Sequence, residues 1–195
     1  MKRSSYLLLA ASAWLALFIP SHAQAAASGP KHATVLIIRH AEKPESGDGL
    51  TAAGEKRAAF YVGYFENFQV NSQPLKLDYL FAARDSKGSE RPVLTVQPLS
   101  EALRLPINGD FKNRDYPQLA DRLRSGTYDN KSILICWHHG EIPELLRALG
   151  ANPDQLLPKG KWPKEMFGLV IQLRYDGSGH LAESRTIHEP PVPGS

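Results

Sequence analysis

Arginine and histidine side chains directly follow two apolar segments of the chain, a position from which they could act together. Arg39 and His40 end the first segment, and His138 and His139 follow the second. Arg91 lies between these segments in the sequence, near the start of a predicted helix. A guanidinium group matches the oxygens of a phosphate and stays charged, and a neutral imidazole is a nucleophile. These residue types are suited to binding a phosphoryl group and transferring it to histidine.

Both apolar segments are predicted to be strands that are buried on both faces of a mostly parallel sheet. Residues 35–38 and 132–137 contain unbroken runs of apolar, largely aliphatic side chains. In open α/β sheets, active sites lie beyond the carboxyl ends of the strands. If the two strands are neighbours, we expect Arg39 and the histidines to meet at one edge of the sheet.

Arg91 is predicted to lie in the first turn of a helix that Ser89 caps. The backbone N–H groups of such a turn favour an anion, and a cation there is unfavourable unless something negative binds nearby. The position of Arg91 therefore indicates an anion site. Arg84, in the preceding loop, is either a third phosphate contact or a solvated surface residue.

The rest of the pattern predicts a single domain in which strands and helices alternate. This alternation indicates an α/β domain over residues 33–189, with a mostly parallel sheet and a β-hairpin at its edge. Residues 26–32 are expected to form a linker and residues 190–195 a flexible tail. Further strands are predicted over residues 77–82, 168–175 and 180–188, and further helices after a Thr51 cap, over residues 116–124 and from Ile142 to a stop at Gly150.

The first 25 residues have the pattern of a secretory signal peptide. Lys2 and Arg3 precede a long apolar run, and residues 23–25 match a small-x-small cleavage site. An uncleaved anchor is the alternative, but the apolar run is shorter than the roughly 20 residues that span a membrane. We expect cleavage after Ala25 or Ala27. The protein would then be exported, periplasmic or secreted, and without stable membrane insertion.

Charge and cysteine content bear on nucleic acid binding and on disulfide bonding. The formal net charge is +3, and the loss of Lys2 and Arg3 with the leader reduces it to +1. A nearly neutral protein gives no argument for nucleic acid binding, and we expect none. Cys136 is the only cysteine, so a disulfide framework is excluded and the fold must rest on its hydrophobic core.

Four segments resemble, in order, the motifs of the histidine phosphatase, or phosphoglycerate mutase-like, superfamily. Residues 39–42, Arg-His-Ala-Glu, resemble its Arg-His-Gly-Glu signature, with Ala41 where many members have glycine. Residues 89–95 resemble its Arg-x-x-x-Thr helix start, and residues 137–140 resemble the strand end that carries its second histidine. Residues 50–55 resemble the Leu-Thr-x-x-Gly segment that follows the first motif.

The resemblance implies both a fold and a set of roles. The fold would be a three-layer α/β/α sandwich with a mostly parallel central sheet. His40 would be the phosphorylated nucleophile, Arg39 and Arg91 would bind the phosphoryl group, and a second histidine would complete the pocket. The resemblance covers most of residues 33–150.

The second histidine and the proton donor are each left open among candidates. His139 is favoured because it directly precedes Gly140, as the catalytic histidine does in many members, whereas His138 has the better spacing to Ile142 for others. The general acid must be a group close enough to protonate the leaving oxygen. The candidates are Glu42, Asp85, Asp110 and Glu141.

The expected function is the hydrolysis of phosphomonoesters through a phosphohistidine. The arginines supply the positive charge that phosphoryl transfer needs, so we expect no metal and no cofactor. A metal site of His138, His139 and Glu42 or His188 is an alternative, but adjacent residues of a strand point in different directions and share one ion poorly. Another alternative is an exported protein that binds phosphate or a phosphoester on the same fold without turnover. The partner would be a phosphorylated small molecule or a phosphate on a larger molecule.

A basic loop precedes the strand predicted over residues 168–175, and its position depends on the direction of that strand. If the strand is antiparallel to its neighbours, the loop lies at the active-site edge and could recruit polyanionic substrates. If the strand is parallel, the loop is a solvated surface at the opposite end. The loop contains Lys159, Lys161, Trp162 and Lys164.

Overall fold

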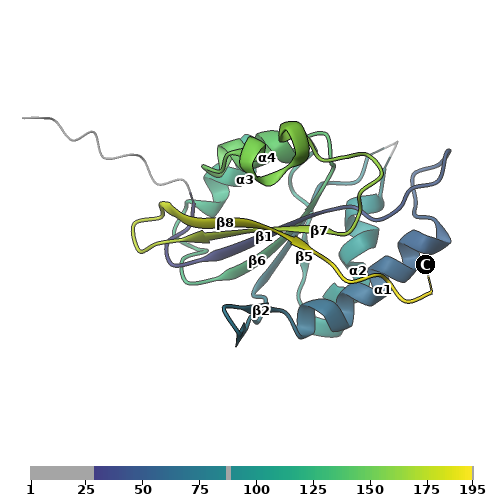
Figure 1. Ribbon diagram of the computed structural model, residues 1–195, viewed down its shortest axis with the longest axis horizontal. Coiled ribbons are helices and arrows are strands. Elements are labelled where there is room, and N and C mark those ends of the chain that lie inside the picture. The colour runs from purple at the N-terminus through teal and green to yellow at the C-terminus, as the bar shows by residue number, and fades with distance from the viewer. Residues whose placement is uncertain (1–28, 87–88, 195) are drawn as a thin grey trace, which may run out of the picture.

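A six-stranded sheet forms the centre of the protein (Figure 1). The computed structural model describes residues 29–86 and 89–194. The strand order is β5-β4-β6-β1-β7-β8. The strands are β1 (Thr34–Arg39), β4 (Tyr79–Ala82), β5 (Ile107–Asn108), β6 (Ser132–Trp137), β7 (Leu169–Tyr175) and β8 (Leu181–His188), and β2 (Gln69–Val70) and β3 (Gln73–Pro74) form a separate hairpin.

Helices cover both faces of the sheet, so the predicted three-layer α/β/α fold is confirmed. Figure 1 shows α3 and α4 on one face and α1 and α2 on the other. Because side chains alternate along a strand, Val35 and Ile37 of β1 pack with the first pair of helices, and Leu36 and Ile38 pack with the second. The helices are α1 (Ala52–Glu66), α2 (Arg91–Leu103), α3 (Tyr116–Leu123), α4 (Ile142–Ala148) and α5 (Pro153–Leu156), followed by a 3-10 turn at Pro158–Gly160.

The direction of the strands decides which loops meet at the edge of the sheet. Strands β5, β4, β6 and β1 are parallel, as predicted. Strand β7 is antiparallel to both β1 and β8, which confirms the hairpin predicted at the edge. Because Ile37 pairs with Ile171, the start of β7 lies beside the carboxyl end of β1. The basic loop before β7 therefore lies at the same edge as Arg39 and His40.

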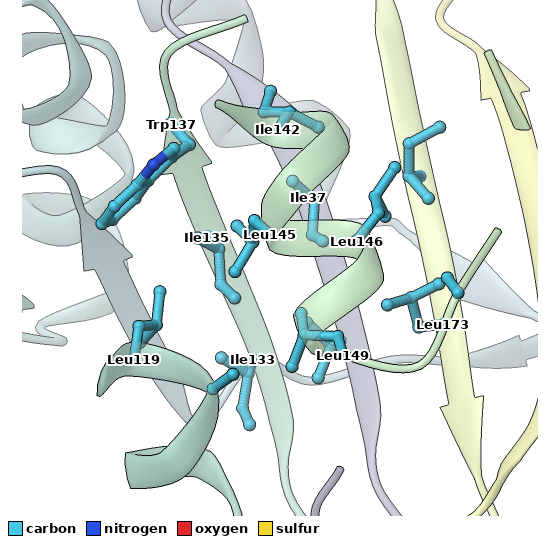
Figure 2. Close-up of a cluster of buried hydrophobic side chains, with 14 of the residues drawn as sticks. Ile37, Leu119, Ile133, Ile135, Trp137, Ile142, Leu145, Leu146, Leu149 and Leu173 are labelled. Atoms are coloured by element: carbon cyan, nitrogen blue, oxygen red, sulfur yellow. The ribbon is translucent and has the colours of Figure 1, made fainter. Parts of the chain in front are cut away.

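Helix α4 carries the apolar face predicted for it. Figure 2 shows Ile142, Leu145, Leu146 and Leu149 lying against side chains of the central strands, and all four are fully buried. The helix stops before Gly150, whose φ of +81° is accessible to glycine without steric cost. Truncating one such buried leucine to alanine typically lowers the free energy of unfolding by about 2–5 kcal/mol. The apolar face of α4 therefore holds this helix, which follows His138 and His139 in the chain, firmly against the sheet.

Local signals located most helices but not all of their boundaries. Thr51 caps α1, as predicted, by accepting a hydrogen bond from the Gly54 N–H at 3.1 Å. The predicted Ser89 cap of α2 is wrong in position, because Glu90 is the N-cap residue and makes no side-chain cap bond. Strand β5 lies in a stretch that showed no strand pattern, because two residues are too few to show a period.

The described parts of the predicted linker, residues 29–32, and of the predicted tail, residues 190–194, both contact the domain. The predicted signal peptide, residues 1–25, lies outside the described residues. In the predicted linker, the His32 N–H donates to the Asp176 carbonyl at 2.8 Å. In the predicted flexible tail, Val192 is buried and Lys56 Nζ donates to the Gly194 carbonyl at 2.5 Å. Within residues 29–86 and 89–194, no helix is both long and apolar enough to cross a membrane.

Candidate active site

The ends of β1 and β6 bring the predicted site residues together. Arg39 pairs with Trp137 in the parallel ladder, and the His40 N–H donates to the Trp137 carbonyl at 3.0 Å. His138 and His139 directly follow Trp137, so both reach the same edge as His40. Arg39 is only 1% exposed and His40 only 2%. The two residues at the end of β1 are therefore held almost entirely inside the protein.

The His40 ring is held as a neutral imidazole with a defined tautomer. Its Nδ1 lies 2.7 Å from the Ala41 carbonyl, which can only accept a hydrogen bond, so Nδ1 carries the proton. The lone pair then lies on Nε2. Burial, with contributions from the charges of Arg39, His138 and Arg91, lowers the pKa of His40 to about 3. His40 is therefore uncharged at neutral pH, and the free lone pair on Nε2 gives the ring the chemistry that a nucleophile requires.

His138 and His139 both lie near His40. The ring centroids are 5.2 Å from His40 for His138 and 6.5 Å for His139. Burial, followed by the charge of Arg91, lowers the pKa of His138 to about 4. Burial, followed by the charges of Arg39 and Lys164, lowers the pKa of His139. His138 is thus the nearer ring, and the choice between the two as the second histidine stays a prediction.

Arg39 links the site to the loop that precedes β7. Its Nη1 donates to the carbonyls of Pro163 at 3.4 Å, Lys164 at 2.5 Å and Met166 at 3.3 Å. Its guanidinium carbon lies 3.9 Å from the centroid of the Phe167 ring, a cation–π contact. Among the described residues, Nε is buried without a partner and nothing bonds Nη2. Arg39 thus supports the loop while one side of its guanidinium is left for another acceptor.

Arg91 lies in the first turn of α2, as predicted, and is held against the loop before α1. Its Nε donates to the Gly49 carbonyl at 3.1 Å, and its Nη2 donates to the Gly47 carbonyl at 2.5 Å. Its Nη1 donates to Ser89 Oγ at 3.2 Å. These bonds use three of the five guanidinium hydrogens. The other two remain for an anion, while the protein bonds fix the orientation of the group.

The four candidate proton donors lie in different surroundings. Both carboxylate oxygens of Glu42 accept hydrogen bonds from Arg57 Nε at 3.0 Å. Glu141 is the N-cap residue of α4 and makes no cap bond. Asp85 and Asp110 lie in exposed loops, and burial followed by the charge of Glu90 raises the pKa of Asp85. These surroundings do not single out one donor.

Arg84, the third arginine considered for phosphate binding, contacts backbone instead. Its Nε donates to the Gly109 carbonyl at 3.2 Å, and its Nη2 donates to the Asp110 carbonyl. The side chain is exposed and connects the loop after β4 with the loop after β5. The surface interpretation of Arg84 therefore fits these contacts better than a phosphate contact.

The sequence patterns did not predict a network of hydrogen bonds and ion pairs that joins Glu42 to Arg57, Tyr61 and Glu189. Arg57 of α1 bonds Glu42, and its Nη1 also donates to Glu189 Oε2 at 2.9 Å. Tyr61 donates to the other oxygen of Glu189 at 2.9 Å. Burial raises the pKa of Glu189 to about 7, although Arg57 and Tyr61 oppose the shift. No local signal could have found this network, because Glu189 is 132 residues from Arg57 in the sequence.

A cavity of about 510 Å³ opens beside Arg39 and His139. We call it the first cavity. The first cavity is lined by Arg39, Glu42, Lys43, His139, Lys164, Glu165 and Phe167.

Among the described residues, no group of three or more histidine, cysteine, aspartate or glutamate side chains is arranged to hold a metal ion.

Comparison with known proteins finds similarity only among solved structures. No protein-family model and no curated protein matches the chain. The structure of the protein histidine phosphatase SixA complexed with tungstate is 18% identical, with a TM-score of 0.49, over 77% of this chain and 95% of that chain. A protein from Agrobacterium tumefaciens described as a phosphohistidine phosphatase SixA has the same identity, TM-score and share of this chain, and 96% of that chain is covered.

A more distant solved structure is a phosphoserine phosphatase mutant from Entamoeba histolytica in complex with phosphoserine. It is 15% identical, with a TM-score of 0.42, over 78% of this chain and 96% of that chain. All these structures have the histidine phosphatase fold. The chain is similar to these structures at low identity, and its own motifs resemble those of the histidine phosphatase, or phosphoglycerate mutase-like, superfamily.

Proposed function

We propose that the chain is a phosphomonoester hydrolase that forms a phosphohistidine on His40. The observation that carries the proposal is the 2.7 Å contact between His40 Nδ1 and the Ala41 carbonyl, which leaves Nε2 unprotonated. Arg39 and Arg91 are both near enough to His40 for their charges to lower its pKa, so a phosphoryl group bound to them would lie close to the ring. Arg39 and Arg91 would stabilise a bound phosphoryl group, each charge-assisted hydrogen bond contributing about 1.5–3 kcal/mol.

The reaction would proceed in two displacements at phosphorus. In the first, His40 Nε2 attacks the phosphorus in line, and an N–P bond forms as the ester P–O bond breaks. The leaving alcohol takes a proton from one of the nearby acids. In the second, a water molecule attacks phosphorus and gives a proton back to the same acid, the N–P bond breaks, and inorganic phosphate leaves. His40 then returns to its neutral state.

The second histidine would bind an oxygen of the transferring phosphoryl group. His138 is the nearer ring to His40 and is the more affected by Arg91, whereas His139 lines the first cavity beside Arg39. We propose His138 for contact with the phosphoryl group and His139 for contact with the rest of the substrate. This division differs from the assignment favoured by the sequence, where His139 was preferred because Gly140 follows it.

Export and independence of metal are parts of the same proposal. The leader predicted over residues 1–25 supports an exported, periplasmic or secreted enzyme. Two arginines supply the charge that a metal supplies in other phosphoryl transfer enzymes, so turnover should survive a chelator.

The test is hydrolysis of 4-nitrophenyl phosphate by the wild type and by His40→Ala, with a chelator present in both. Turnover that survives the chelator and is lost in His40→Ala supports the proposal, especially if acid-labile ³²P is trapped on the wild type alone. Turnover that persists in His40→Ala rejects the nucleophile. Phosphate binding by the wild type without any turnover favours the second candidate, a non-catalytic phosphoester-binding protein.

A further inference from the structure

A second cavity adjoins the first cavity and shares part of its wall. It has a volume of about 500 Å³ and lies between the start of α4 and the loop at residues 160–164. His139 and Lys164 line both cavities. A molecule bound in the first cavity could therefore extend past His139 into the second. The other residues of the second cavity include Pro143, Glu144, Arg147, Lys161 and Trp162.

The wall of the second cavity carries positive charge that the described protein does not neutralise. Lys161 and Lys164 are exposed, and no ion pair joins either of them to a carboxylate in residues 29–86 and 89–194. Arg147 is paired with Glu144 at 2.5 Å, so these two charges offset each other. Two ammonium groups remain, and a charged acceptor at this position would form charge-assisted hydrogen bonds with them.

The loop that carries these lysines is fixed to the site by specific contacts. Trp162 is buried, and its Nε1 donates to the Met166 carbonyl at 2.7 Å. Arg39 donates to the Lys164 carbonyl from the same guanidinium group that would hold the phosphoryl group. The separation between the two anion positions is therefore set by the folded chain, and such preorganisation reduces the entropy lost when a ligand binds.

We propose that the second cavity binds a second anionic group, a carboxylate or a phosphate, on the leaving group of a small phosphomonoester. The inference rests on the proposed function, which places the phosphoryl group at His40. Trp162 and Pro143 offer apolar wall for the carbon skeleton that joins the two anions. The preferred substrates would then be phosphorylated carboxylic acids or bisphosphates.

The test uses three phenyl phosphates that differ only in the para substituent: carboxymethyl, phosphonomethyl or carbamoylmethyl. The amide matches the carboxylate in size and lacks its charge. For at least one of the two anionic compounds, we expect kcat/KM to be about tenfold or more above the value for the amide. This is the effect of about one charge-assisted hydrogen bond. Whichever anionic compound has the higher kcat/KM shows whether the second cavity prefers a carboxylate or a phosphate. In Lys161→Gln the ratio should fall toward one.

Lys159→Gln is the matched control, because Lys159 belongs to the same loop and lines neither cavity. It should keep the wild-type ratio, and an equal loss of preference in both variants would mean general attraction by surface charge. Equal kcat/KM values for the three compounds in the wild type would overturn the inference while leaving the proposed function intact.

Binding to His40→Ala, measured by calorimetry, tests the second cavity without turnover. We expect the Kd ratio between amide and anion to show the same preference, and Lys161→Gln on that background to remove it. If the wild type hydrolyses none of the compounds but this ratio is present, the proposed function fails and the anion subsite stands. If the ratio is absent, the subsite is rejected.

Discussion

The Ala41 N–H donates to Thr95 Oγ1 at 2.9 Å, and this bond ties the backbone after His40 to helix α2. The same hydroxyl donates to the Arg91 carbonyl at 2.7 Å. One buried side chain therefore connects the backbone beside the proposed nucleophile, which directly follows β1, with the arginine proposed to bind the phosphoryl group. Because Ala41 also provides the carbonyl that sets the His40 tautomer, a shift of this residue would change both orientation and protonation of the ring.

Replacing Thr95 with valine should weaken both stability and turnover. The change keeps the shape of the side chain but leaves the buried Ala41 N–H without an acceptor, which costs about 1–3 kcal/mol. Misplacement of His40 should lower kcat about ten- to hundredfold. Urea unfolding and steady-state kinetics measure the two effects. Thr95→Ser keeps the hydroxyl and should recover most of kcat, whereas equal losses in both variants would argue against the hydrogen bond as the cause.

His138→Ala and His139→Ala should differ in which kinetic parameter they change. His138 lies nearer to His40, so its loss should lower kcat for every phosphomonoester. His139 lines both cavities, so its loss should act mainly through KM and depend on the leaving group. Kinetics with phenyl phosphate and with its carboxymethyl derivative separate these effects. A uniform loss of kcat in His139→Ala alone would return the catalytic role to His139.

Gly54 allows the first helix to approach the loop that follows β1. A Cβ on Gly54 would lie 2.5 Å from the Glu42 carbonyl oxygen, a distance that real Cβ atoms do not show. Gly54→Ala should therefore destabilise the protein by about 1–3 kcal/mol. Gly63→Ala, in the same helix, meets nothing within 4 Å and should stabilise it by about 0.5–1 kcal/mol. Thermal unfolding compares them, and equal shifts would contradict the steric argument.

Arg57 should be needed for stability because it forms an ion pair with the Glu189 carboxylate, which has no access to water. The Glu189 side chain is 0% exposed, and Arg57→Leu would leave it with Tyr61 as its remaining side-chain donor among residues 29–86 and 89–194. Removal of one partner from such a pair costs about 3–5 kcal/mol. The double variant Arg57→Leu, Glu189→Gln should recover part of the loss, as measured by chemical denaturation. If the double variant is as unstable as the single one, the charge on Glu189 is not the cause.

His40 should make the stability of the protein depend on pH in a defined direction. Burial holds its pKa at about 3 in the folded state, below the 6.5 of an unfolded chain. Between these values the unfolded state binds more protons, so the free energy of unfolding falls as the pH falls. The contribution is fully present above about pH 6.5 and is progressively lost below it. The slope between about pH 6.5 and 4 should be smaller in His40→Asn than in the wild type, and equal slopes would contradict a buried neutral ring.

The sequence by itself determined the α/β class, the central strands and which residues would lie at the end of those strands. The apolar runs at residues 35–38 and 132–137 gave the two central strands, because a strand buried on both faces needs apolar side chains on each. The polar residues that end these runs then had to lie at the carboxyl edge. The leucine spacing after Ile142 likewise indicated α4 and its buried face. Apolar runs and helical spacing are properties of short segments, so they can be recognised without knowing how the rest of the chain folds.

Only the tertiary structure decided how distant segments meet at that edge. Hydrophobic periodicity shows which face of a strand is buried but not its direction or its neighbour, so the antiparallel course of β7 had to be seen before the lysine loop could be placed. The same holds for the relative distances of His138 and His139 from His40 and for the Arg57–Glu189 pair. These contacts depend on side-chain geometry between residues far apart in sequence, which no local pattern records.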